Sequence, residues 1–185
     1  MMRITLVSGS NRANAASTNL LKYMQGLLEP QNITVTLIDL AQLPLPLFTP
    51  DNWDFHPNAK HMLDTFAESD GIVLATPEYH GSLSGVLKNA LDYVNPTLIA
   101  GKPVLSVSSA GGPLGVSSLT HLQTIVRNLH GINCSEWISV GFGTQAFDAD
   151  GVLADEEVRT RVSDVLESFV QLTRTLGTTN LAAFK

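Results

Sequence analysis

A chain of 185 residues with 44% hydrophobic and 15% charged residues is expected to form one globular domain, and its composition excludes a disordered protein. The formal net charge of −6 disfavours binding to nucleic acid, because no cluster of Lys and Arg is present to neutralise phosphates. No apolar run approaches the roughly 20 residues that a membrane-spanning helix needs, and residues 1–7 become polar too soon for a signal peptide. We therefore expect a cytoplasmic protein with no membrane partner.

The only cysteine, Cys134, cannot form an internal disulfide, which is typical of a reducing compartment. It lies in an apolar stretch, so a packing role is favoured over a reactive thiol. A domain of this length needs neither a metal nor a disulfide for stability, because it buries about 70% of the surface of its unfolded chain. We predict no metal site.

Strand and helix patterns alternate along the chain. Five runs rich in β-branched and apolar residues predict strands at 4–7, 33–38, 71–75, 103–108 and 132–140. Apolar residues at helical spacing predict a helix after each strand, at 17–29, 59–68, 83–94, 116–129 and 158–177. Gly131 is expected to end the fourth helix as a left-handed cap. A proline-rich loop covers residues 41–58.

This alternation predicts an α/β domain with a parallel sheet that helices cover on both faces. We expect a single domain over residues 1–177, followed by a loose C-terminal tail at 178–185. Ligands of open α/β sheets bind beyond the carboxyl ends of the strands. The loops after the first, third and fourth strands are therefore the places to look for a site.

The first of these loops, residues 9–19, is rich in hydroxyl and amide side chains and precedes a helix N-terminus. Such an end binds anions, because its N–H groups point outward. Arg12 is expected to pair with a phosphate, and Ser10, Ser17 and Thr18 to donate to it. Alternatively, Ser17 or Thr18 only caps the helix. The motifs of P-loop and dinucleotide-binding proteins are both missing.

The other two loops suit a flat ligand. In residues 76–82, Pro77 stiffens the backbone, Gly81 permits a tight turn and Tyr79 offers an aromatic face. In residues 108–115, two adjacent glycines allow a close approach to a ligand. Each loop also has a plain alternative: Tyr79 packs in the core, and the glycines form an ordinary turn. Together with the anion site, the loops predict a phosphate end and a flat end, which is the shape of FMN.

The three loops resemble those of the NAD(P)H-dependent FMN reductase family. The resemblance rests on Gly-Ser-x-Arg at 9–12, on Thr-Pro-Glu-Tyr-His-Gly-Ser at 76–82 with Gly-x-Leu-Lys-Asn-Ala-Leu-Asp at 85–92, and on Ser-Ala-Gly-Gly at 109–112. It covers about residues 3–140. Two departures are a longer gap between Arg12 and Ser17, and His80 where many members have Asn.

The resemblance implies a flavodoxin-like three-layer sandwich with a five-stranded parallel sheet in the order 2-1-3-4-5. It further implies FMN as cofactor, NADPH or NADH as electron donor, and a homodimer or homotetramer. The implied cofactor-binding residues are Ser10, Arg12, Ser17, Thr18 and Asn19 at the phosphate, Pro77, Glu78, Tyr79 and His80 at the isoalloxazine and ribityl, and Ser109, Gly111 and Gly112 on the other side of the ring.

The resemblance also implies an enzyme that passes electrons from NAD(P)H through flavin N5 to quinones, azo dyes, chromate or free flavin, in a ping-pong cycle that needs no catalytic side chain. An alternative is a flavodoxin-type carrier that does not oxidise NAD(P)H, and a second is a flavin-free interaction protein. The aromatic residues of the proline-rich segment, Phe48, Trp53 and Phe55, are expected to cover the flavin of a neighbouring subunit. Their alternative is to pack on their own chain.

Overall fold

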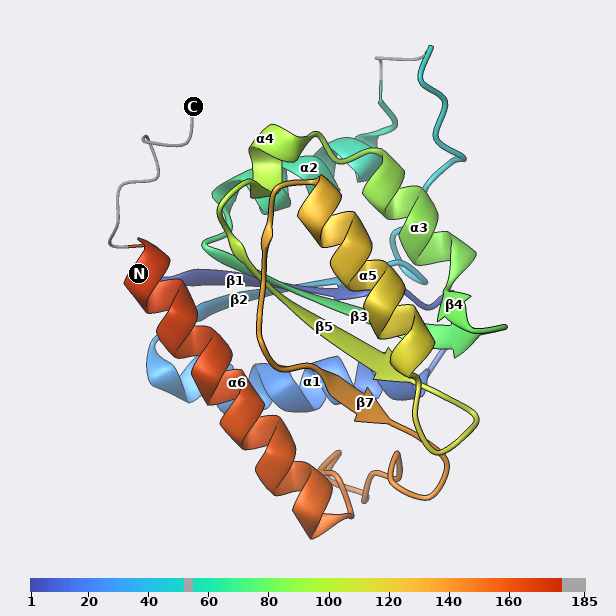
Figure 1. Ribbon diagram of the computed structural model, residues 1–185, viewed down its shortest axis with the longest axis vertical. Coiled ribbons are helices and arrows are strands. Elements are labelled where there is room, and N and C mark those ends of the chain that lie inside the picture. The colour runs from blue at the N-terminus through green and yellow to red at the C-terminus, as the bar shows by residue number, and fades with distance from the viewer. Residues whose placement is uncertain (52–54, 178–185) are drawn as a thin grey trace.

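The computed structural model describes residues 1–51 and 55–177 (Figure 1). Trp53 and the expected tail at 178–185 lie outside these residues. The strands are β1 (Arg3–Ser8), β2 (Thr34–Asp39), β3 (Gly71–Tyr79), β4 (Ser82–Leu83), β5 (Pro103–Ser109), β6 (Ile132–Asn133) and β7 (Ile138–Val140). The helices are α1 (Ala16–Leu28), the 3₁₀ turn η1 (Glu29–Gln31), α2 (Pro57–Glu68), α3 (Gly85–Asp92), α4 (Pro96–Ile99), α5 (Val116–Asn128) and α6 (Glu156–Gly177).

The strands form one sheet in the order β2-β1-β3-β5-β6, with β7 also pairing with β5. All these pairs are parallel, and only the short β4 runs antiparallel, beside β3. The first seven residues of β3 are all buried, as expected of a central parallel strand that is covered on both faces. The predicted flavodoxin-like α/β architecture and strand order are confirmed.

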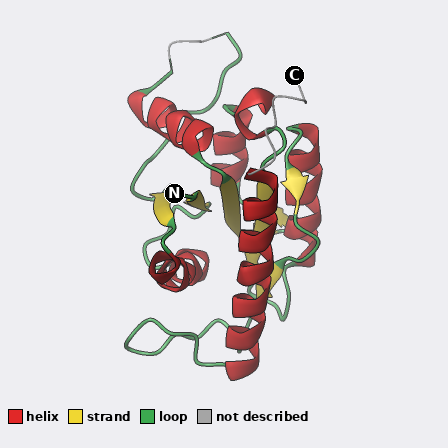
Figure 2. Cartoon of the chain, turned by 90° about the vertical axis from the view of Figure 1, so that its left-hand side faces the viewer, coloured by secondary structure: helices red, strands yellow, loops and turns green. Residues whose placement is uncertain are grey.

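Helices flank both faces of the sheet (Figures 1 and 2), and an apolar layer lies between the sheet and the helices on each face. One layer joins α1 and α6 to the sheet through side chains such as Leu20, Met24 and Phe169. The other joins α2, α3, α4 and α5 through Met62, Leu87 and similar residues. Alternate residues of each strand face opposite layers, because the side-chain period of a strand is two. Among the described residues, no helix is both long enough and apolar enough to cross a lipid bilayer.

Three sequence predictions need correction. The strand expected at 132–140 is divided into β6 and β7, which both pair with β5. The third strand does not stop at Ala75 but continues to Tyr79, and β4 begins at Ser82, so most of the expected second loop is strand. The left-handed residue after α5 is His130, with a φ of 63°. Gly131 is instead closely packed, because a Cβ there would lie 2.9 Å from Cγ1 of Val126.

The proline-rich segment is fastened to its own chain. The rings of Phe48 and Phe55 each meet Tyr93 edge to face, with centroids 5.2 and 5.3 Å apart. The side-chain amide of Asn89 accepts the N–H of Phe48 and donates to the carbonyl of Pro46, at 2.8 Å in both cases. The two described aromatics of this segment, Phe48 and Phe55, thus pack on their own chain, and their reach to the flavin of a neighbouring subunit stays a prediction.

Lys102, just before β5, secures the C-terminal end of α2. Its Nζ donates to the carbonyls of Phe66 and Ala67 at 2.7 and 2.9 Å, which satisfies two acceptors that a helix end leaves open. Burial lowers the pKa of Lys102 from its ordinary value, and the nearby Asp70 carboxylate opposes this effect. The contact fixes one edge of the helical layer to the sheet.

Candidate functional site

A cleft of about 610 Å³ opens beyond the carboxyl ends of β1, β3 and β5, the edge at which open α/β sheets bind ligands. All three predicted loops contribute to it. The predicted residues that line it are Ser10, Arg12, Asn19, Pro77, Glu78, Tyr79, Ser109 and Gly111. Four other predicted residues do not line it: Ser17, Thr18, His80 and Gly112.

The N-terminus of α1 faces the cleft without a cap of its own. The residue before the helix is Ala15, which offers no side-chain hydrogen bond, and the first turn holds no acidic side chain. Ser17 Oγ is buried and has no hydrogen-bond partner among the described residues. Because free N–H groups and a hydroxyl without a partner favour an anion, this end of the cleft fits a phosphate.

Two further polar residues of the first loop differ in what they face. Arg12 is exposed and lines the cleft, and its backbone N–H donates to Ser10 Oγ at 3.1 Å. Thr18 is buried, and its hydroxyl lies 2.7 Å from Ser8 Oγ. The hydroxyl of Thr18 therefore bonds inward to β1, whereas Arg12 is placed to meet a ligand.

The first loop is tightly packed where it leaves β1. A Cβ at Gly9 would lie 2.6 Å from Cβ of Leu87 and 2.8 Å from the carbonyl oxygen of Ala75. The N–H of Gly9 donates to that same carbonyl at 2.7 Å. Ser84, the N-cap of α3, donates its hydroxyl to the carbonyl of Gly9. These contacts fix the anion end of the cleft relative to β3.

The second loop is a β-hairpin. Its strands pair Tyr79 with Ser82, and the two residues between them, His80 and Gly81, have φ values of 52° and 74°. A two-residue connection with positive φ at both positions is a type I′ turn, and His tolerates the left-handed region better than most residues. This turn places His80 at the tip, away from the cleft, and leaves Tyr79 46% exposed at the cleft wall.

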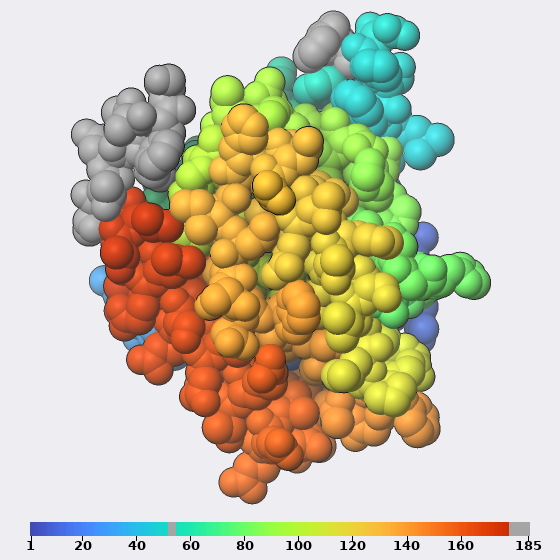
Figure 3. All heavy atoms as spheres, viewed as in Figure 1, coloured from blue at the N-terminus to red at the C-terminus, as the bar shows by residue number. Residues whose placement is uncertain are grey.

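The third loop presents a bare backbone to the cleft. A Cβ at Gly111 would meet nothing within 4 Å, and Gly111 does not have a positive φ. Neither backbone strain nor packing therefore requires a glycine there, and the bare backbone leaves room for a flat ligand to approach closely. The carbonyl of Gly112 accepts the N–H of Phe142 at 2.9 Å, and Figure 3 shows residues 110–115 (yellow) beside residues 141–147 (orange).

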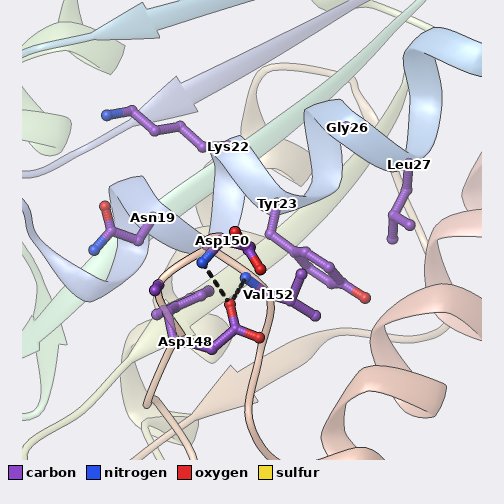
Figure 4. A pocket seen from close by; sticks show the side chains of 11 residues that line it. Asn19, Lys22, Tyr23, Gly26, Leu27, Asp148, Asp150 and Val152 are labelled. Carbon is purple, nitrogen blue, oxygen red and sulfur yellow. Dashed lines mark hydrogen bonds between the residues drawn. The ribbon is translucent and has the colours of Figure 1, made fainter.

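Sequence reasoning did not foresee that Gln145 and Phe147, after β7, line the cleft. Phe147 and Asn19 also border a second hollow of about 600 Å³ between α1 and the turn at 147–152 (Figure 4). Oδ1 of Asp148 accepts the N–H groups of Asp150 and Val152 at 3.0 and 2.9 Å and so stiffens this turn. The pattern Asp-Ala-Asp-Gly at 148–151 signals a turn, but it does not show what the turn packs against.

Cys134 takes no part in the cleft. It lies in the layer shared with α6 and is only 7% exposed. Burial raises the pKa of its thiol to about 12, so the nucleophilic thiolate is scarce at neutral pH. The structure supports the packing role.

The cleft thus joins an anion end at α1 to a flat, glycine-walled end between β3 and β5. A model of the NADPH-dependent FMN reductase family matches residues 2–145. This chain belongs to that family. It is an FMN-dependent oxidoreductase that takes its electrons from NAD(P)H, and the donor groups of the cleft fit the phosphate and the ring of that cofactor.

Named relatives and solved structures agree with this assignment. The FMN-dependent NADPH-azoreductases of Staphylococcus haemolyticus (strain JCSC1435) and Staphylococcus aureus (strain USA300) are both 33% identical, over 91% of this chain and 95% of theirs. The flavoenzyme NAD(P)H:(acceptor) oxidoreductase FerB from Paracoccus denitrificans superposes with a TM-score of 0.82 at 23% identity, over 95% of this chain and 98% of its own. An archaeal flavodoxin gives a TM-score of 0.63 at 11% identity, over 94% and 99% of the two chains. The two structures support the fold alone.

Proposed function

We propose that this enzyme binds FMN in the cleft at the carboxyl ends of β1, β3 and β5, and passes electrons from NAD(P)H to azo dyes, quinones, chromate or free flavin in a ping-pong cycle. The observation that carries the placement is the coincidence of two features in one cleft. One is an uncapped helix start with Arg12 beside it, and the other is Gly111, whose missing side chain nothing in the chain explains. The names of the azoreductase relatives favour azo dyes among the acceptors.

In this proposal the protein binds and orients, and no side chain acts as a nucleophile or base. The α1 N–H groups, Ser17 Oγ and Arg12 hold the phosphate. Pro77 and Tyr79 lie on one side of the ring, and Gly111 lies on the other. Bound FMN supplies the redox chemistry, taking a hydride from the nicotinamide and giving electrons to the acceptor. The half-exposed Tyr79 leaves the mouth of the cleft open for nicotinamide and acceptor to enter in turn.

A matched pair of glycine variants tests the placement. Gly111→Leu projects a side chain into the cleft, whereas Gly112→Leu adds the same side chain next to it; neither position has a neighbour within 4 Å of the new Cβ or a positive φ. We expect FMN affinity to fall at least tenfold in Gly111→Leu and by less than threefold in Gly112→Leu, with both variants folded. Equal FMN affinity in the two variants would exclude Gly111 from the ring site.

Turnover tests the chemistry. Anaerobic addition of NADPH, and separately of NADH, to the FMN-loaded protein should bleach the visible flavin band, and an azo dye should then restore it. Initial rates at several fixed acceptor concentrations should give parallel double-reciprocal lines, as a ping-pong cycle requires. Flavin that stays oxidised with either nucleotide would support the carrier function instead, and intersecting lines would refute the ping-pong cycle.

We also propose that the protein is cytoplasmic and forms a homodimer or homotetramer. Its buried thiol suits a reducing compartment. Beside the cleft, Leu114 and Phe142 are 62% and 78% exposed, and exposed apolar side chains of this size favour association of two copies. Light scattering on the wild type and on Phe142→Ser tests this: a wild type that is already monomeric would refute the assembly.

A further inference from the structure

Glu78, in the hairpin of β3 and β4, forms a hydrogen bond with helix α5. It lines the cleft from β3, and its Oε2 accepts the backbone N–H of Ser118 at 2.9 Å. Ser118 is the third residue of α5, and the first residues of a helix have N–H groups without partners inside the helix. Glu78 therefore acts as an N-cap supplied from another element, 40 residues away in the chain.

Within the described residues, α5 has no other side-chain cap at its N-terminus. The residue before it is Gly115, which offers no side chain, and its first turn contains no acidic residue. A carboxylate at a helix N-terminus is favoured both by its hydrogen bond and by the helix dipole. The start of α5 thus depends on a residue of the flavin-binding hairpin.

A second contact joins the same two elements one turn further along. Ser82 in β4 lies 2.9 Å from Nδ1 of His121 in α5, oxygen to nitrogen. Both residues that hold the hairpin in this way flank its tight turn, one on each strand. The hairpin is consequently tied to α5 at two points, of which the inner one, at Glu78, borders the cleft.

The start of α5 is also bound to the third loop. Gly115 donates its N–H to Ser139 Oγ at 2.8 Å, and Ser108 Oγ donates to the same oxygen at 3.0 Å. The hydroxyl of Ser118 donates to the carbonyl of Gly115 at 3.0 Å. A continuous set of hydrogen bonds therefore runs from Glu78 through the first turn of α5 to the loop that carries Gly111.

We propose that Glu78 is a positioning residue, which sets the spacing between Pro77 and Tyr79 on one wall of the cleft and Gly111 on the other by bonding to α5. The inference rests on the proposed placement of FMN in this cleft. Without the bond, the hairpin is free to move away from α5 and the two walls no longer hold the ring at a fixed distance. Glu78 then affects the flavin through Ser118.

The test separates this role from general stability. Glu78→Ala removes the cap, and we expect a melting temperature lower by roughly 3 °C for a chain of this size, together with FMN affinity at least tenfold weaker and a shifted visible flavin spectrum. Glu78→Gln keeps an acceptor oxygen at the same length and should stay within threefold of the wild-type affinity. Gln behaving like Ala would show that the charge matters rather than the bond, and would overturn the proposal.

A stability-matched variant completes the experiment. Gly26 lies inside α1, outside the cleft, and a Cβ there would meet nothing within 4 Å. Gly26→Ala should therefore raise the melting temperature by a few degrees. In Glu78→Ala/Gly26→Ala, the melting temperature should return to that of the wild type while FMN affinity stays low. Recovery of FMN affinity together with stability would reduce Glu78 to a structural cap and overturn the proposal.

Arg12→Ala shows whether a negative result refutes the positioning role of Glu78 alone or also refutes the binding of FMN in this cleft. If Arg12→Ala weakens FMN binding and Glu78→Ala does not, the cleft stands and the positioning role is wrong. If neither substitution changes FMN affinity, FMN does not bind in this cleft and both proposals are wrong.

Discussion

Replacing Arg12 by Ala tests the phosphate end of the cleft most directly. Within residues 1–51 and 55–177, no acidic side chain forms an ion pair with its guanidinium. The side chain is exposed and borders the cleft, so its removal breaks no internal contact. We expect the free energy of unfolding to change by less than about 0.5 kcal/mol.

The expected loss of FMN affinity follows from the hydrogen bond that Arg12 would make to the phosphate. A hydrogen bond between charged groups contributes about 1.5–3 kcal/mol, and solvent around the exposed Arg12 places it at the lower end of that range. A loss of about 1.5–2 kcal/mol weakens FMN binding by roughly 10–30-fold. Binding is not abolished, because the uncapped N–H groups at the start of α1 remain at the cleft.

Riboflavin is the matched ligand for this experiment, since it carries the ring and the ribityl chain without the phosphate. Fluorescence titration of both flavins with both proteins gives a four-way comparison. Arg12→Ala should weaken the binding of FMN and leave riboflavin unchanged, and raising the salt concentration should weaken FMN binding less in the variant than in the wild type. Equal loss for FMN and riboflavin would show that Arg12 does not contact the phosphate.

Three further predictions concern groups outside the cleft. Because burial lowers the folded-state pKa of Lys102 from 10.5, the unfolded chain binds more protons just below that pH. The unfolding free energy of the wild type should then rise towards about pH 10 relative to Lys102→Met, as urea melts can measure; a falling difference would contradict the sign. With its pKa raised to about 12, Cys134 should resist an aromatic disulfide reagent at neutral pH in the native protein and react once per chain in denaturant. Asn89→Ala should lower the free energy of unfolding by about 1–2 kcal/mol and speed proteolysis within residues 44–50. The control is Lys88→Ala, because the Lys88 side chain forms only an exposed ion pair with Asp92; it should leave both stability and proteolysis unchanged.

Periodicity sufficed for the parts of the fold that depend on local burial. The strand-and-helix alternation, the parallel sheet and the loops that meet at one edge follow from the alternation of apolar runs, because parallel strands buried on both faces are nearly continuous in apolar residues, whereas the strand order came from the family resemblance. Ser10, Arg12, Pro77, Tyr79 and Gly111 were placed at the cleft for the same reason, since carboxyl ends of parallel strands converge, whereas Asn19 was implied by the family resemblance.

The remaining features depend on contacts between distant segments, which a local pattern does not encode. Nothing around Phe147 indicates that the turn after β7 folds back to the cleft. Thr18 has the same chemistry as Ser17, but the Thr18 hydroxyl bonds to Ser8, whereas the Ser17 hydroxyl is buried without a partner among the described residues. His80 belongs to the motif, yet the type I′ turn carries it to the hairpin tip. Residues 132–140 are apolar enough for one strand, but two segments of that stretch pair separately with β5.

The α-helices differ in whether the residue just before them caps their N-terminus. Four helices receive a side-chain acceptor at the N-terminal end from the residue just before them: His56 for α2, Ser84 for α3, Asn95 for α4 and Asp155 for α6. The other two α-helices of the described residues, α1 and α5, follow Ala15 and Gly115 and have no such cap. The start of α1 lines the cleft, and the start of α5 bonds to Glu78, which also lines it. In α5, Glu78 supplies the missing negative charge from β3. In α1 no acidic side chain within the described residues does so, and an anionic ligand would satisfy these N–H groups at lower free energy than water alone. The uncapped N-terminus of α1 is therefore a specific argument for placing the FMN phosphate there, because it distinguishes this helix from the other five α-helices that the structure describes.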